Sequence, residues 1–127
     1  MTTVDKCKAI TLLIPTKGRP KFLRRTLMYY RSLSFTGNIL ILDSSVGSDL
    51  EEDITLVNEL RQDLNIGFHC NPEMSELAAT RFLIDLVRTP YVAELQDDNF
   101  LVPRGISTCI EFLENNQSYS ACRGIGI

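Results

Sequence analysis

The order of apolar and polar residues along the chain predicts strands and helices in alternation. Short apolar runs predict four strands, the first two of them buried on both faces. These runs are AITLLIP from Ala9, GNILILD from Gly37, IGFHC from Ile66 and YVAEL from Tyr91. The segment YSACRGIGI, from Tyr119, is expected to begin one more strand. Alternating strands and helices predict an α/β fold with a mostly parallel sheet that helices cover on both faces.

Apolar residues at helical spacing predict a helix after each strand. Pro20 suits the first position of the first helix, and Pro103 introduces the last one. Ser48 and Glu51 have the spacing of a capping box at the start of the second helix. The positions expected on the apolar helix faces are Phe22, Leu23, Leu27, Tyr30 and Leu33; Leu50, Ile54, Val57, Leu60 and Leu64; Leu77, Ile84 and Val87, within a helix over residues 75 to 88; and Ile106, Ile110 and Leu113.

The bulk composition is typical of a single globular domain. With 127 residues, 44% of them hydrophobic, the chain can bury a core of ordinary size. No apolar run approaches the ~20 residues of a membrane span, and the N-terminus lacks the pattern of a signal peptide, so we expect a cytoplasmic protein. The four cysteines are scattered without a C-x-x-C pair and the chain has one histidine, which argues against a zinc site and favours free, mostly buried thiols.

Charge is distributed unevenly along the chain. Eight of the 13 basic residues lie in the first 31 positions with only Asp5 opposing them, so this segment carries about +7 and the remainder about −10. Two interpretations stay open, a solvated helix face and a patch for an anion such as a phosphate or a lipid head group. Nucleic acid is a poorer candidate partner, because the rest of the chain is acidic and we expect no stacking aromatics among the basic residues.

Three loops are expected at the carboxyl edge of the sheet, where parallel α/β sheets bind ligands. They are PTKGRP, DSSVGSD and QDDNF. In the last one, Asp97 and Asp98 are adjacent like charges, which are costly unless a cation or hydrogen-bond donors compensate them. An exposed turn that caps the next helix and a site for Mg²⁺ or Mn²⁺ both explain this pair. Asp43 ends another strand, where it suits a ribose hydroxyl or a base N–H as well as an ordinary turn.

Three segments, in their order and spacing, carry a resemblance to a known family. They are ITLLIPTKGRPKFLRRTLMYYRSL, NILILDSSVGSD and AATRFLIDLVRTPYVAELQDDNFLVP. Over residues 8 to about 124 the chain resembles the nucleotide-binding half of a family-two glycosyltransferase with the GT-A fold. The resemblance implies a Rossmann-like domain over residues 1–127 that binds a nucleoside-diphosphate sugar, most commonly a UDP-sugar in that family.

The resemblance also implies roles for individual residues. Pro15 and Thr16 match the backbone site that holds the base. Asp43 matches the carboxylate that contacts the base or the ribose. Arg81 matches a basic residue that lies near the base or the diphosphate. QDDN stands in place of the family's D-x-D motif, although Gln96 replaces its first acid. By this analogy Asp97 faces the ribose, and Asp98, with Asp97, holds the Mn²⁺ or Mg²⁺ that bridges the two phosphates. Lys17 and Arg19 are candidate phosphate contacts, with plain solubility as the alternative.

The chain departs from the family pattern at its end. Members of the family continue into an acceptor-binding half that supplies a general base, whereas this sequence stops at Ile127. The catalytic residue is therefore unknown, and the acceptor (glycan, lipid-linked or protein) is unassigned. We expect either a cut chain or a natural half-length protein, with self-association covering its open sheet edge. Sedimentation as a stable monomer would remove the basis for that self-association.

Two other classes of protein remain as alternatives to a glycosyltransferase. A non-catalytic nucleotide-binding or assembly module would explain the absent base. A flavodoxin-like or receiver-like domain also clusters acids at strand ends, but a receiver needs a lysine after a late strand, and none is present there. The basic N-terminal segment is in addition a candidate for peripheral contact with a membrane, a hypothesis that fails if the protein binds no anionic liposomes at low salt.

Overall fold

The computed structural model describes residues 5–124. Its strands are β1 (Ile10–Thr16), β2 (Asn38–Asp43), β3 (Asn65–Cys70) and β4 (Tyr91–Glu94). A short 3-10 helix, η1 (Cys7–Ala9), precedes β1. The α-helices are α1 (Pro20–Ser32), α2 (Gly47–Leu60), α3 (Glu76–Ile84) and α4 (Pro103–Asn115). The four predicted strands and the helices between them are thus confirmed.

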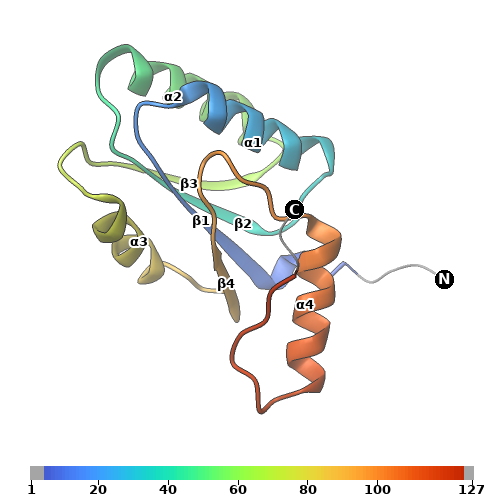
Figure 1. Ribbon diagram of the computed structural model, residues 1–127. Coiled ribbons are helices and arrows are strands. Elements are labelled where there is room, and N and C mark those ends of the chain that lie inside the picture. The colour runs from blue at the N-terminus through green and yellow to red at the C-terminus, as the bar shows by residue number, and fades with distance from the viewer. Residues whose placement is uncertain (1–4, 125–127) are drawn as a thin grey trace.

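The four strands form one parallel sheet in the order β3-β2-β1-β4. From β1 the chain steps outward through β2 to β3, then returns past β1 to add β4 on the other side. The topological switch therefore lies between β1 and β4, the position at which such sheets bind ligands. Helices α1 and α2 cover one face, α3 covers the other, and α4 lies beside η1 at the amino end of β1 (Figure 1). The predicted parallel α/β sheet with helices on both faces is confirmed.

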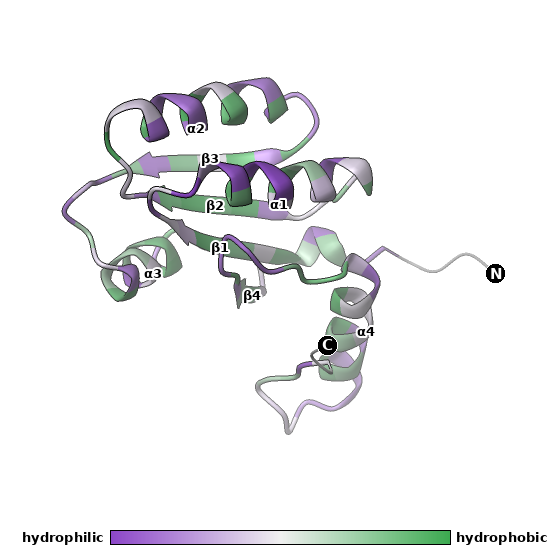
Figure 2. Cartoon of the chain, turned by 45° about the horizontal axis from the view of Figure 1, so that its top comes forward, coloured by the Kyte–Doolittle hydropathy of each residue, from purple (hydrophilic) through white to green (hydrophobic). Residues whose placement is uncertain are grey.

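The larger core lies between the sheet and the pair α1–α2. Alternate residues of β1 point to this face, and α4 joins the same core through its first turns. Colouring by hydropathy shows apolar strands and helices that carry polar residues along their outer sides (Figure 2). The fully buried members of this core include Leu12, Ile14, Leu23, Leu27, Tyr30, Ile39, Ile41 and Leu60.

The core on the opposite face is smaller and depends on α3. Leu13 and Leu42 from the sheet pack there against Ala79 and Leu83, which are four residues apart on the helix. Ser75 caps α3 by accepting a hydrogen bond from the Ala78 amide at 3.2 Å. The helix ends at Ile84, four residues before the predicted boundary, because residues 85–86 form a turn.

Several predicted details of the helices are wrong. The predicted face of α3 is incorrect, since Leu77 is 82% exposed and Ile84 is 50% exposed. Ser48 does not cap α2, which begins at Gly47 after Val46 and has no side-chain cap. Of the other residues placed on apolar faces, Phe22, Leu33 and Ile54 are exposed. These positions have the right spacing, but a helix buries only the side that its neighbours cover.

The last predicted strand is not formed in the part of it that the structure describes. Residues 119–124 have no regular secondary structure, and residues 125–127 lie outside the described range. The cysteines are free, as predicted, but only Cys7 is buried, whereas Cys70 and Cys122 are exposed. None of the helices within residues 5–124 has the length and apolar character needed to cross a membrane.

Candidate functional site

The candidate site lies where β1 and β4 separate at their carboxyl ends. Pairing between these strands ends at Leu13 and Glu94, followed by one more hydrogen bond from the Leu95 amide to the Leu13 carbonyl at 2.8 Å. Pro15 lies beyond this last pair, where its missing amide hydrogen costs the β1–β4 ladder nothing. The chain after β4 therefore leaves the sheet and crosses over the end of β1.

Asp97 is fixed at this crossing by three partners. Its side chain is almost fully buried, and Thr16 Oγ1 donates to its Oδ2 at 2.8 Å. Arg19 Nη1 lies 3.2 Å from its Oδ1, so both carboxylate oxygens are partnered. Thr26 of α1 also donates to the Asp97 backbone carbonyl at 2.6 Å. Residues from β1, its following loop and α1 thus hold one carboxylate in a single orientation.

Asp98 is more open and has one oxygen to spare. Arg19 Nη2 is 3.0 Å from its Oδ2, and Arg25 donates to its backbone carbonyl at 3.2 Å. Its Oδ1 is buried but has no hydrogen-bond partner. The Arg19 guanidinium therefore forks between two adjacent carboxylates, which offsets the repulsion between Asp97 and Asp98. One acceptor oxygen remains available for a further cation or donor.

Aromatic rings flank this group of charges. The Arg19 guanidinium carbon lies 4.3 Å from the centroid of the Phe22 ring. Arg25 lies 5.2 Å from the same ring and 5.4 Å from that of Phe100, which is itself partly exposed. Such cation–π contacts orient the guanidinium groups at the surface. We expected no stacking aromatics among the basic residues, whereas the Phe22 ring stacks against Arg19 and Arg25.

The loop after β2 is tied to the loop after β1. Ser44 donates its amide to the Thr16 carbonyl at 2.9 Å, and Ser45 Oγ accepts from the Gly18 amide at 2.7 Å. Gly18 has φ of +63°, a left-handed conformation that favours glycine. These contacts place Asp43 at the same sheet edge as Thr16, in register with it across the β1–β2 pair.

Asp43 is completely buried, which the sequence did not indicate. Its Oδ1 accepts from the Ser45 amide at 2.8 Å, and its Oδ2 has no partner. Beside it lies Asp53 of α2, also completely buried, and apart from the Asp43 carboxyl neither of its oxygens has a hydrogen-bond partner. Burial, together with the hydrogen bond and negative charge of Asp43, raises the pKa of Asp53 to about 8.

Sequence reasoning missed Asp53, although a signal was present. Asp53 lies on the inward stripe of α2 with Leu56, Val57 and Leu60, at the spacing i, i+3, i+4 and i+7. An ionisable residue on an otherwise apolar stripe is rarely buried unless it is paired. The spacing alone therefore pointed to a buried acid in need of a partner.

The remaining predicted residues are further from this group. Lys17 is exposed on the loop after β1, and Arg81 is exposed on α3. Within residues 5–124, neither forms a side-chain hydrogen bond or an ion pair with Asp43, Asp97 or Asp98. The structure thus brings together Pro15, Thr16, Arg19, Asp97 and Asp98, and places Asp43 on the adjoining strand.

The acidic pair fits a metal only in combination with a ligand. In the described part of the chain, no three His, Cys, Asp or Glu residues are grouped to hold a metal ion. Asp98 nevertheless has a buried oxygen without a partner, next to a second carboxylate. Mg²⁺ commonly takes one or two carboxylates and completes its shell with phosphates and water. The residues present fit a cation of that kind, bound together with a phosphorylated ligand.

A cavity at the other end of the sheet does not share this chemistry. Its volume is about 570 Å³, and Lys8, Arg31 and Asp63 are among the residues that line it. It lies where β1 and β3 begin, away from the carboxyl edge. The site at β1 and β4 is therefore identified by its side chains and topology rather than by an enclosed volume.

Comparisons with known proteins support the fold. No protein-family model matches the sequence, and no curated protein sequence matches it either. Among solved structures, the mannosyltransferase PcManGT from Pyrobaculum calidifontis, in complex with GDP-Man and Mn²⁺, has a TM-score of 0.68 and 12% identity. That match covers 83% of this chain and 32% of the mannosyltransferase.

Two structures of S. aureus TarS are also similar. Residues 1–349 of TarS give a TM-score of 0.72 at 12% identity, covering 93% of this chain and 38% of that one. A second TarS structure gives 0.69 at 13% identity, covering 93% and 23%. The chain thus spans less than two fifths of each of these proteins, with a GT-A-like fold. At such low identity the likeness establishes the fold alone.

Proposed function

We propose that this domain binds a nucleoside-diphosphate sugar at the carboxyl ends of β1 and β4, together with a divalent cation. One observation carries the proposal: Asp97 and Asp98 stand at the topological switch point, and Asp98 keeps a buried oxygen without a partner. The mannosyltransferase with a similar fold is described in complex with GDP-Man and Mn²⁺, which supports a ligand of this class.

The side chains suit the parts of such a ligand. Thr16 and Pro15 present β1 backbone to the base, and Asp97, already oriented by Thr16, suits a ribose hydroxyl. Arg19 and Lys17 suit the diphosphate, since a guanidinium that forks between two carboxylates can also pair with phosphate oxygens. Asp98, with Asp97, would hold Mn²⁺ or Mg²⁺, which neutralises charge on the leaving diphosphate when bound.

The reaction that we propose is glycosyl transfer, with this domain as the donor-binding part. Among the residues described, none is placed to deprotonate an acceptor hydroxyl, and Glu94 lies within β4. The acceptor, whether glycan, lipid-linked or protein, therefore stays open. A non-catalytic nucleotide-binding module is the second candidate, favoured by the same lack of an assigned base. A uridine nucleotide is our first choice of donor, with guanosine as the comparison.

Calorimetric titration tests the donor site. We expect UDP to bind the wild-type domain in the presence of Mn²⁺, and the Asp98→Ala variant to bind at least tenfold more weakly, because the metal loses its carboxylate. Asp85→Ala is the matched control, since it removes an exposed acid from the end of α3, away from the site. It should bind as tightly as wild type.

Two results would refute the donor site. One is the absence of binding with either UDP or GDP, and the other is binding that needs no metal and survives Asp98→Ala. If binding holds, the release of UDP from UDP-sugars above the metal-only background separates an enzyme from a binding module.

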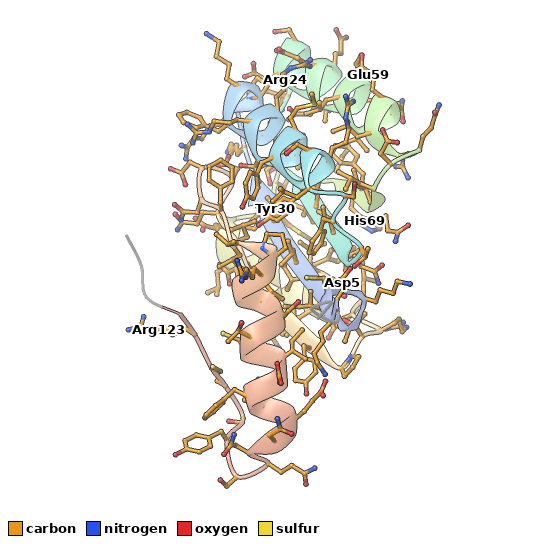
Figure 3. The ribbon with its side chains drawn as sticks, turned by 90° about the vertical axis from the view of Figure 1, so that its right-hand side faces the viewer. Asp5, Arg24, Tyr30, Glu59, His69 and Arg123 are labelled. Carbon is orange, nitrogen blue, oxygen red and sulfur yellow. The ribbon has the colours of Figure 1, made fainter. Side chains whose placement is uncertain are left out.

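Peripheral contact with a membrane is a further proposal for the basic segment. Lys21, Arg24 and Arg31 are exposed on α1, and Figure 3 shows Arg24 on its outer side. An anionic surface would bind them most strongly at low salt.

We also propose that β4, which lies at an edge of the sheet, pairs with a second copy in solution. The liposome and sedimentation experiments given with the sequence analysis test these two proposals.

A further inference from the structure

Two buried acids lie at the carboxyl edge of the sheet, beside the proposed nucleotide site. Asp43 is the last residue of β2, and Asp53 lies in the second turn of α2. Each exposes 0% of its surface. Of their four carboxylate oxygens, only Asp43 Oδ1 accepts a hydrogen bond from a donor fixed in the fold, the Ser45 amide. Asp43 Oδ2 and both oxygens of Asp53 have none.

Two ionised carboxylates cannot share such a place without compensation. Burial removes the water that would stabilise their charges, and each charge opposes the other. A single proton between them resolves the conflict, because a protonated carboxyl donates a hydrogen bond to an ionised one. Burial, then the hydrogen bond to Asp43, then the charges of Asp43, Glu52 and Asp49 raise the pKa of Asp53 to about 8.

Among residues 5–124, the charges that act on Asp53 are all acidic, so they do not replace the proton. Asp49 and Glu52 on α2 add negative charge. Cys70 ends β3 in register with Asp43, and partial burial of its thiol, with the charges of Asp43 and Asp53, raises the pKa of that thiol. From the loop after β2, Ser45 contributes a neutral amide.

We propose that Asp53 is a positioning residue for Asp43: it keeps a proton at neutral pH and through it donates a hydrogen bond to the Asp43 carboxylate, which orients that carboxylate at the nucleotide edge. The Ser45 amide holds one oxygen of Asp43 and Asp53 holds the other. Ser45 also binds the Gly18 amide, next to Arg19, so the orientation of Asp43 is linked to the phosphate side of the site. The effect of Asp53 on nucleotide affinity rests on the proposed function, whereas the proton shared by the two acids does not.

The stability of the fold should depend on this proton. In the unfolded chain Asp53 loses its proton near the ordinary aspartate pKa of 3.8, whereas in the folded protein its pKa is about 8 and it keeps the proton up to that pH. Between these values the folded state binds more protons, so stability falls as the pH rises. One proton can change the unfolding equilibrium constant by at most about tenfold per pH unit.

Urea unfolding between pH 5 and pH 8 tests the shared proton. Asp53→Asn replaces the protonated acid by an amide that donates a hydrogen bond at every pH, so its stability should fall less steeply with pH than that of wild type. Glu51→Gln removes one acid from the exposed side of the same helix and is the matched control, with a slope like that of wild type. Equal slopes for wild type and Asp53→Asn would overturn the proposal.

A second variant tests the shared proton independently, in case Asp53→Asn does not fold. Asp43→Asn removes the partner's charge and supplies an amide donor to Asp53, which then no longer needs to retain a proton. It should also show a shallower fall in stability between pH 5 and pH 8. A slope as steep as that of wild type would contradict the shared proton.

Nucleotide affinity against pH tests the positioning role. With UDP and Mg²⁺, wild-type affinity should fall severalfold between pH 7 and pH 9, as Asp53 ionises beside Asp43. Asp53→Asn should bind like wild type at pH 7 and stay nearly constant to pH 9, whereas Asp53→Ala should bind weakly throughout, because it has no donor for Asp43. If Asp53→Asn is as weak as Asp53→Ala, Asp53 does not act through its proton. A wild-type domain that binds no nucleotide at any pH refutes the proposed function instead, and the urea experiment then decides whether the proton is shared.

Discussion

At the scale of single residues, Arg19 decides how two adjacent acids can exist at a strand end. Its guanidinium contacts Asp97 at 3.2 Å and Asp98 at 3.0 Å, so it supplies the positive charge that the pair requires. The sequence predicted that a cation or donors must compensate these acids. It could not predict that a side chain of the same protein supplies the compensating charge. The direction of the Arg19 side chain depends on the left-handed turn at Gly18.

Removing Arg19 should expose the charges of both acids. We expect Arg19→Gln to bind Mn²⁺ more tightly than wild type in the absence of nucleotide, about fivefold, which corresponds to the ~1 kcal/mol of a partly exposed ion pair. Titration of free Mn²⁺ by electron paramagnetic resonance measures this. Arg24→Gln, which removes an exposed arginine from α1, should leave the affinity unchanged. Unchanged or weaker Mn²⁺ binding by Arg19→Gln would show that Arg19 does not compete with a metal.

Asp53 marks the limit of sequence interpretation at this scale. The spacing of Asp53 with Leu56, Val57 and Leu60 indicates burial, but the partner comes from a strand end ten residues earlier. Periodicity describes one element at a time, and a contact between two elements appears only when both are placed. For the same reason, Asp43 was predicted as a residue of the edge but not as a fully buried one.

At the scale of elements, strands were easier to predict than the faces of helices. A continuous apolar run can be buried on both faces, so β1 and β2 need little more than their composition. A helix such as α3 buries only Ala79 and Leu83, because the sheet offers it a narrow apolar strip. Leu77 belongs to the same helix yet is 82% exposed, which no periodicity can indicate.

The loop that carries the acidic pair is held to α1 by Tyr30. Its hydroxyl donates to the Leu101 carbonyl at 2.8 Å and accepts from the Leu101 amide at 2.9 Å, and Figure 3 shows it between α1 and α4. Burial raises the pKa of Tyr30 to about 12, so the hydroxyl remains a donor throughout the neutral range. The Tyr30 hydroxyl thus satisfies the hydrogen bonds of both backbone groups of Leu101.

Replacing that hydroxyl should loosen the loop. Tyr30→Phe leaves the Leu101 amide and carbonyl without their partner, which should lower the free energy of unfolding by about 1–3 kcal/mol. Urea unfolding measures the loss, and hydrogen exchange at the Leu101 amide should become faster. Tyr29→Phe is the control, because Tyr29 is only half-buried and contacts Phe100 through its ring. If both variants lose the same stability, the Tyr30 hydroxyl does not hold the loop.

At the scale of the whole molecule, the order of the strands brings the chemistry together. The loops after β1, β2 and β4 are distant in sequence, but the order β3-β2-β1-β4 places them at one edge. The sequence predicted that these three loops would share an edge, because parallel strands all end on the same side. It could not predict which two strands adjoin the switch point, since alternation alone does not fix strand order.

The central claim is that a metal and a nucleotide meet at the ends of β1 and β4. The most direct measurement adds Mn²⁺ to the ¹⁵N-labelled domain in the presence of UDP and records which amide signals broaden. The account predicts that the amides of Thr16, Asp98 and Asn99 broaden first, that those of Asp85 and Glu111 remain sharp, and that Asp98→Ala abolishes the effect. Broadening that begins at another acidic group, or that survives Asp98→Ala unchanged, would contradict it.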